Sequence, residues 1–543
     1  MEEAAVVVSV VVHLAVEDFL ALAGNSWEIM KLFIALCLSI FLCFDLQAQI
    51  PEDALRMSYT LPSGTAREQA IGGAMGSIGG DITANYVNPA GLGFYKTSEV
   101  LISPGWTFNT ANTGYLSTNM KGPYTNNFLL STSGFVWGSS NSPDKSNALS
   151  LTVNRTADFN GHIQYQGQNN YSSASDVYKE EFQASGISYD QAFTTPALSY
   201  GTRMALYTYL IDTSQGGLGP IIAQPDKVLA AGGLLGQNTD IRSSGGITEI
   251  ALGIAGSSKD KWYWGISIGI PIVNYQRTTQ YTETDLSGNK NNDFGYYTYS
   301  ESYSAKGVGV NARLGAIFRP NLNWRFGLAV HTPSIYSITD HLSSSMTTNT
   351  EGYAGTISIQ SDTLDIVANS SNSLEYDLQS PWHLLVSGSY IFPGAVTEGK
   401  MGFITADIEY VANKDVRYSF PLDNNGNQPD NSYFDPLNNT IKSYYKNTFN
   451  FRLGGEYKVN EIAYRLGSSY SMNPYSSPDL KANRITFSGG VGYRKKGIFI
   501  DLTYVEAIMN DVNFPYRLTE KDNYYSTVKQ YTGNLILTFG IKL

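Results

Sequence analysis

The chain has 543 residues, is rich in Tyr (38), Phe (24) and Gly (52), has only 15% charged residues, and has a mean hydropathy of −0.18. This hydropathy excludes a bundle of apolar membrane helices. The formal net charge is −11, and it stays negative, near −6, without the first 48 residues (35 basic against 41 acidic residues), which gives no reason to propose a nucleic-acid partner. Abundant aromatic residues and glycine at a neutral mean hydropathy are typical of a transmembrane β-barrel, which has one lipid-facing and one wet surface.

The N-terminal region carries an export signal. Lys31 precedes an apolar run at 32–44, and a small residue, Ala48, ends the segment. We predict a signal peptide at 30–48 that is cleaved after Ala48. Residues 1–29 are expected to be an upstream extension from a misplaced start codon, with a genuine N-terminal anchor as the alternative.

Both cysteines, Cys37 and Cys43, lie inside this apolar run. The mature chain would therefore contain no cysteine, which excludes disulfides, thiolate metal sites and cysteine nucleophiles.

The next segment, 49–97, is dense in glycine and alanine, as in Gly72-Gly73-Ala74-Met75-Gly76. Small residues let backbones approach closely, so this composition suits a compact plug inside a barrel. A phosphate-binding loop is the alternative, but no Lys-Ser/Thr pair follows the glycines and no strand-turn-helix frame surrounds them.

From residue 98 to 543 the chain shows repeated period-two alternation, which predicts an all-β, 14-stranded antiparallel transmembrane barrel. Short connections alternate with long ones, so all tight turns would lie at one end of the barrel. The predicted strands are 98–109, 126–138, 146–157, 246–256, 261–277, 304–318, 322–337, 380–392, 401–417, 443–458, 461–473, 483–495, 497–509 and 529–542.

The last of these strands shows the two faces most plainly. Leu535, Leu537 and Phe539 alternate with smaller or polar residues such as Asn534 and Thr538. Side chains of a strand alternate between its faces, so the first set would face lipid and the second the lumen.

The longest connection, 158–245, contains apolar residues that would cost stability on an extracellular loop unless they bind a ligand or pack on each other. Both alternatives remain open. The candidate ligand-capture residues are Leu206, Tyr207, Tyr209, Ile221, Ile222, Leu229, Leu234 and Leu235.

Several charged residues fall on the lumen-facing side of their predicted strands: Arg313, Asp407, Glu409, Arg452 and Glu456. Such charges could pair with one another, hold the plug, or bind a ligand carboxylate through a bidentate arginine. Catalysis is not expected, because no histidine pair has metal-ligand spacing and no Gly-x-Ser-x-Gly elbow occurs. We therefore predict no catalytic residue, no metal and no cofactor.

Four short motifs carry a family resemblance: Asn88-Pro89-Ala90 before the first strand, Trp324-Arg325-Phe326-Gly327-Leu328 after a tight turn, Ser380-Pro381-Trp382 opening a strand, and Arg452-Leu453-Gly454-Gly455-Glu456-Tyr457. With them, essentially the whole mature chain resembles the FadL/TodX family of outer-membrane transport proteins. The resemblance implies a barrel plugged by an N-terminal hatch, here 49–97, and places Asn88, Pro89 and Ala90 in that hatch.

The resemblance also implies a function. A hydrophobic molecule such as a long-chain fatty acid or an aromatic hydrocarbon would be captured by the outer loops. It would then pass to a pocket in the lumen and leave sideways into the bilayer. The expected setting is the outer membrane of a Gram-negative bacterium, with outer-membrane lipid, lipopolysaccharide and the barrel assembly machinery as partners of a monomer.

Two alternatives to transport remain. The first is a haem-binding receptor, which would need an axial ligand such as His162 or His341. The second is a structural or adhesive barrel whose loops bind partners while its lumen stays closed.

Overall fold

The computed structural model describes residues 51–58, 63–142, 144–195, 197–214, 219–368, 372–392, 400–423 and 425–543. The predicted extension 1–29 and the predicted signal peptide 30–48, with its cleavage after Ala48, lie outside the described residues.

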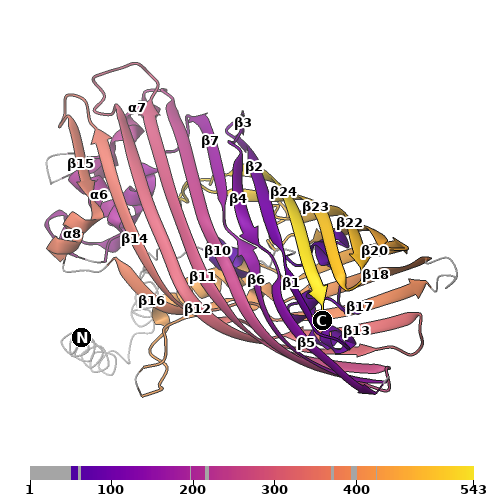
Figure 1. The fold of residues 1–543 in the computed structure, drawn as a ribbon. Helices are drawn as coiled ribbons and strands as arrows, with labels where there is room; N and C mark the ends of the chain where they lie inside the picture. The colour runs from indigo at the N-terminus through magenta and orange to yellow at the C-terminus, as the bar shows by residue number, and fades with distance from the viewer. Residues whose placement is uncertain are drawn as a thin grey trace, which may run out of the picture.

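In the described part of the chain, the strands form a closed antiparallel barrel of 14 spans (Figure 1). The spans are, in order, β1 (Glu99–Ile102) with β2 (Pro104–Tyr115); β3 (Thr118–Lys121), β4 (Thr125–Leu130) and β5 (Ser133–Ser142); β6 (Lys145–Asp158) with β7 (Gly161–Asn169); β10 (Leu235–Ser258); β11 (Trp262–Asp285); β12 (Tyr296–Phe318); β13 (Trp324–His331) with β14 (Ile335–Asn349); β16 (Ser373–Gln379) with β17 (His383–Phe392); β18 (Lys400–Val411) with β19 (Arg417–Ser419); β20 (Thr448–Val459); β21 (Ile462–Ser471); β22 (Arg484–Lys495); β23 (Ile498–Asn513); and β24 (Ser526–Lys542). Both β1 and β2 pair with β24 and so close the barrel. The predicted fold class is confirmed.

The outer surface of the wall is an apolar belt. Along β11, Ile266, Ile268, Ile270 and Ile272 are each 44–51% exposed, whereas Ser267 between them is fully buried. A row of exposed isoleucines is favourable only against lipid, so these side chains define the membrane-facing surface.

Several strands extend beyond this belt, which the sequence did not predict. β10 begins at Leu235 rather than at 246, and β11 continues to Asp285 rather than to 277. On this outer part the exposed residues are polar, such as Asn238 on β10 and Gln280 on β11, so the apolar alternation that marks a membrane strand is missing. The connection predicted at 158–245 is correspondingly shorter, because β7 and the start of β10 belong to the wall (Figure 1).

The outer connections carry the remaining elements. They are α5 (Ser175–Ser185), η3 (Tyr189–Gln191), α6 (Tyr200–Tyr207), β8 (Ile211–Thr213), β9 (Ile221–Ala223), α7 (Gln224–Ala230), β15 (Thr356–Gln360), α8 (Ser361–Ala368), η5 (Asn413–Asp415), η6 (Ser432–Phe434) and α9 (Asp435–Tyr444). None of the helices in the described ranges is long and apolar enough to span a membrane.

The hatch lies inside the barrel and consists of α3 (Pro51–Ser58), α4 (Ala66–Ala70), η1 (Ile82–Asn85) and η2 (Pro89–Phe94). Polar side chains start its last three elements, since Thr65, Asp81 and Asn88 each accept a hydrogen bond from a backbone N–H of the following turn. Short capped turns, rather than long helices, therefore let the hatch fold back and forth within the lumen.

Glycines of the barrel wall seat the hatch backbone. A Cβ atom at Gly265 would lie 2.3 Å from the carbonyl carbon of Pro89, and one at Gly327 would lie 2.1 Å from the oxygen of Gly76. On the opposite side, a Cβ at Gly467 would lie 2.1 Å from the nitrogen of Gly72. No larger residue fits at these three positions, so the hatch is fitted to the wall backbone against backbone.

Candidate functional site

A cavity of about 400 Å³ lies in the lumen beside α3. Part of its lining is apolar, from Leu55 of the hatch and Phe159, Ile163, Ile241 and Val505 of the wall. Tyr275, Tyr281 and Tyr299 add aromatic surface to the same space. Polar and charged residues such as Asn109, Arg155 and Asn534 line the rest of the cavity, and a chamber that combines apolar surface with polar groups is a usual form of small-molecule site.

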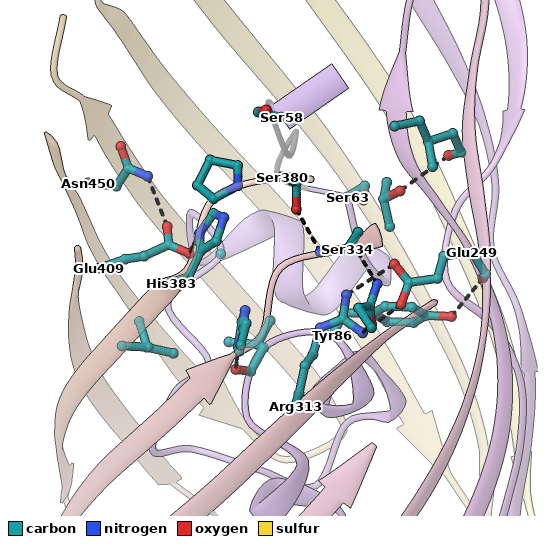
Figure 2. A pocket seen from close by; sticks show the side chains of 18 of the residues that line it. Ser58, Ser63, Tyr86, Glu249, Arg313, Ser334, Ser380, His383, Glu409 and Asn450 are labelled. Carbon is teal, nitrogen blue, oxygen red and sulfur yellow. Dashed lines mark hydrogen bonds and ion pairs between the residues drawn. The ribbon is translucent and has the colours of Figure 1, made fainter. Parts of the chain in front are cut away.

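A second cavity, of about 110 Å³, lies between the hatch and the wall and is polar (Figure 2). Its lining includes Tyr86 of the hatch and Arg313, His383 and Glu409 of the wall. Ser63 lines both cavities, so the polar chamber adjoins the apolar one.

The predicted lumen charges all have protein partners. Arg313 binds both oxygens of Glu249, with nitrogen–oxygen distances of 2.5 and 3.0 Å. Arg452 donates to Glu409, which also bonds to His383. Arg452 and Glu409 therefore pair with each other, whereas Arg313 pairs with an acid outside the predicted set.

The other two predicted charges hold the hatch. Asp407 accepts a hydrogen bond from the backbone nitrogen of Gly76 at 3.0 Å. Glu456 pairs with Arg67 of α4 at 3.4 Å and with Arg465 of the wall at 2.6 Å. These acids therefore connect the hatch to the lumen side of the barrel.

Several partners in these networks, including Glu249 and Arg465, were not predicted from the sequence. Glu249 stands on the lumen side of β10, where it alternates with exposed Ile250. The alternation that singled out Arg313 would have identified Glu249 as well. Its pairing with Arg313 depends on side chains meeting from β10 and β12, which are separated by β11.

Asn88 occupies the position that joins the hatch to the wall. Its side-chain oxygen accepts from the nitrogen of Ala90 at 3.1 Å, and its side-chain nitrogen donates to the oxygens of Gly76 at 2.6 Å and Ala316 at 3.3 Å. Pro89 and Ala90 lie against Gly265 of β11. The three motif residues thus lie in the hatch and contribute to its seat.

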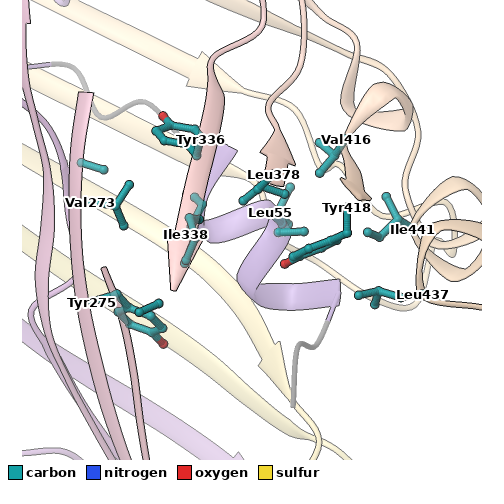
Figure 3. Close-up of a cluster of buried hydrophobic side chains, with 14 of the residues drawn as sticks. Leu55, Val273, Tyr275, Tyr336, Ile338, Leu378, Val416, Tyr418, Leu437 and Ile441 are labelled. Atoms are coloured by element: carbon teal, nitrogen blue, oxygen red, sulfur yellow. The ribbon is translucent and has the colours of Figure 1, made fainter. Parts of the chain in front are cut away.

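Helix α3 packs farther out in the lumen, among residues of the outer wall and loops (Figure 3). Asp53 accepts a hydrogen bond from Arg277 at 2.9 Å, and Arg56 donates to the hydroxyl of Tyr275 at 2.6 Å. Leu55 is buried in the same cluster. The helix therefore forms one wall of the apolar cavity.

The hydrogen-bonded wall is interrupted beside this cavity. β4 pairs with β2, and β5 pairs with β6 only as far as Ser133 and Val153. Between β4 and the following part of the wall, residues 154–161, no strand pairing occurs in the described residues. We call this interruption the window; Leu129, Asn160 and Ile163 beside it line the larger cavity.

The third span is bent at the window. Between β6 and β7, Phe159 turns into the lumen and contacts Tyr275 edge-on, with ring centroids 5.1 Å apart. On the partner strand, Gly245 and Gly246 have φ of +98° and +157°, and the register shifts between Ile247 and Thr248. A bulge of this kind bends a strand away from its neighbour.

The candidate capture residues separate into three groups by burial. Leu206 and Leu235 are fully buried in a core shared by the outer loops, so packing, one of the two alternatives, accounts for them. Tyr207 (46% exposed) and Leu234 (38%) lie on the surface. Tyr209, Ile221, Ile222 and Leu229 are half-buried.

The comparisons with known proteins are limited to structure. No family model and no curated protein matches the chain. A crystal structure of a Pseudomonas aeruginosa FadL homologue matches with a TM-score of 0.50 at 12% identity, covering 89% of this chain and 99% of that one. This likeness shows the fold. The Pseudomonas putida toluene transporter TodX (TM-score 0.47, 11% identity) and the Ralstonia pickettii toluene transporter TbuX (0.46, 14%) match over 89% of this chain and 99% of theirs.

Proposed function

We propose that this chain is an outer-membrane protein of a Gram-negative bacterium for the passive uptake of hydrophobic molecules. The observation that carries the proposal is the position of the larger cavity, which extends from α3 to the window in the barrel wall. A ligand held there has an apolar chamber on one side and a route to the bilayer on the other.

The hatch argues for a sideways exit. Backbone-to-backbone contacts at Gly265, Gly327 and Gly467 close the lumen at the end where the short turns lie. An unpaired strand edge that faces lipid is unfavourable, because its backbone N–H and C=O groups have no hydrogen-bond partner there. A window in the wall is therefore stable only where other protein groups cover it or where it lines a polar passage. A hydrophobic ligand would leave through this window rather than through the hatch.

Apolar burial supplies the binding energy in this proposal. Each Å² of apolar ligand surface removed from water contributes about 25 cal/mol, so uptake requires neither a nucleotide nor an ion gradient. The surface residues Tyr207 and Leu234, with half-buried Tyr209, Ile221, Ile222 and Leu229, are the proposed capture region.

The two alternatives find less support. Of the two candidate axial ligands, His162 lines the larger cavity and bonds to Asp240 at 3.0 Å, whereas His341 lies on the exposed side of β14, opposite to buried Asp340. The two histidines therefore do not face one common haem site. An adhesive barrel requires no lumen cavity and no window. We expect a monomer that is inserted by the barrel assembly machinery and surrounded by lipid and lipopolysaccharide.

Blocking the window tests the proposal. Ser131 is fully buried beside the window and lines the cavity there, so Ser131→Trp would block the opening and the part of the chamber next to it, while the lining from α3 stays unchanged. We expect the variant to bind a hydrophobic fluorophore saturably in vesicles but to lose its uptake. Ser302→Trp on the exposed face of β12 is the matched control and should change neither. Undiminished uptake by Ser131→Trp, or no saturable binding by the wild type, would contradict the proposal.

A further inference from the structure

The wall of the larger cavity next to the window carries a group of polar side chains that the proposed transport of hydrophobic molecules does not explain. The register aligns Asn127 of β4, Thr107 of β2 and Asn534 of β24 in one row across three strands. Asn109 follows in the next row. We call these four residues the polar patch.

The polar patch faces the lumen rather than lipid. Thr107 and Asn109 are 3% and 5% exposed, whereas Trp106 and Phe108, which alternate with them, are 48% and 46% exposed on the outer surface. Thr107, Asn109 and Asn534 line the larger cavity. Leu129 and Ile536, in the adjacent row, line the same cavity with apolar surface.

Four atoms of the polar patch lack a hydrogen-bond partner among the described residues. They are Thr107 Oγ1, Asn109 Oδ1, Asn127 Nδ2 and Asn534 Oδ1. Buried polar atoms are bonded in the great majority of cases, and an unbonded one destabilises the fold unless another molecule bonds to it. The two amide oxygens, of Asn109 and Asn534, accept hydrogen bonds, and the amide nitrogen of Asn127 donates them. The hydroxyl of Thr107 can donate or accept.

The chemistry of this surface selects among hydrophobic ligands. A plain hydrocarbon placed against the polar patch would leave all four atoms without a partner. A carboxylate would lose its hydration without meeting a cation, because the polar patch has none. Five arginines also line the cavity, and each already has a protein partner. Arg155 pairs with Asp158, both Arg56 and Arg277 pair with Asp53, Arg517 pairs with Glu52, and Arg484 is not free either.

We propose that the polar patch is a specificity site for an apolar molecule that carries an uncharged hydroxyl or carbonyl group. The apolar body lies against Leu129, Ile536 and the facing chamber wall, and the oxygen bonds to Thr107 and Asn534. This proposal rests on the proposed uptake function and narrows its substrate class.

Three probes with one carbon skeleton test the proposal: 2-methylnaphthalene, 2-naphthalenemethanol and 2-naphthoate, titrated into the full-length protein in lipid nanodiscs. Thr107→Val combined with Asn534→Leu removes two polar groups at nearly constant volume. We expect this double variant to bind the alcohol about threefold to tenfold more weakly than the wild type does, and the hydrocarbon equally well or better. Thr107→Val alone should show the smaller part of the same change, which guards against a folding defect of the double variant.

Leu129→Ala is the matched control, because it removes apolar contact from the adjacent row and should weaken all three probes alike. Equal effects of the double variant on all three probes, or none, would overturn the specificity site and leave uptake of hydrophobic molecules standing, with water as the partner of the polar patch. Failure of the wild type to bind any of the three probes would overturn both proposals.

Discussion

The lumen is organised differently at its two ends. At the short-turn end, hatch and wall meet backbone against backbone at glycines, and ion pairs such as Glu456 with Arg465 fill the remaining space. Farther out, α3 is held by side chains, a cavity of about 400 Å³ remains, and one joint of the wall is unpaired. The closed end of the lumen and the cavity beside the interrupted wall therefore occupy separate places in one barrel.

The largest expected effect concerns the buried ion pair of Arg313 and Glu249. Arg313→Met should lower the free energy of unfolding by about 3–5 kcal/mol, because it leaves the Glu249 carboxylate buried and unpaired. Urea unfolding in vesicles measures this change. Arg242→Met is the control: its pair with Asp240 is 68% exposed on the arginine side, so the change should stay within about 0.5 kcal/mol. Equal losses of unfolding free energy in both variants would contradict a stabilising role for the buried Arg313–Glu249 pair.

The seat of the hatch gives the next largest effect. Gly265→Val would place side-chain atoms against the backbone of Pro89 and should destabilise the barrel by about 3 kcal/mol. It should also admit a small hydrophilic dye into liposomes, because the displaced hatch no longer closes the lumen. Gly388→Val, with open space around its Cβ position, should do neither. If liposomes with the Gly265→Val variant still exclude the dye, the glycine contacts do not close the lumen.

The barrel architecture could be predicted from the sequence, but the window in its wall could not. The alternation of Leu535, Leu537 and Phe539 with Thr538 predicted a lipid face and a lumen face, and the exposed and buried sides of β24 agree. The window was beyond prediction because it depends on which strands fail to pair, and pairing is a property of register rather than of composition. The outer strand segments were missed because their exposed side chains are polar on β10 and β11.

Loop residues should show a smaller and local effect. Leu206→Ala should loosen the outer loop core by about 2 kcal/mol, seen as faster amide exchange in α6, and should leave the barrel unchanged. Tyr207→Ala, on the surface of the same helix, should not alter exchange but should slow ligand capture. If Leu206→Ala slows ligand capture and Tyr207→Ala does not, the buried loop core rather than the exposed surface captures the ligand.

The smallest effect is pH-dependent and belongs to the hatch. Burial raises the pKa of the Glu68 carboxyl to about 8, with Asp81 adding to the shift and Arg452 opposing it. Ionising this group in the folded hatch is unfavourable, so the wild type should lose stability as the pH rises from about 5 through 8. Glu68→Gln removes this dependence, and the two unfolding profiles should separate in favour of the variant above pH 6. Parallel profiles would contradict the buried neutral carboxyl.

Photo-crosslinking with a ligand analogue shows whether a ligand enters the lumen and reaches the window. A diazirine derivative of 2-naphthalenemethanol would be activated on the full-length protein in vesicles, and the labelled residues identified by mass spectrometry. We predict labels at Leu129, Phe159 and Ile163, which line the cavity from α3 to the window. Labels confined to outer loops or to belt residues such as Ile268 would contradict a ligand path through the lumen and the window.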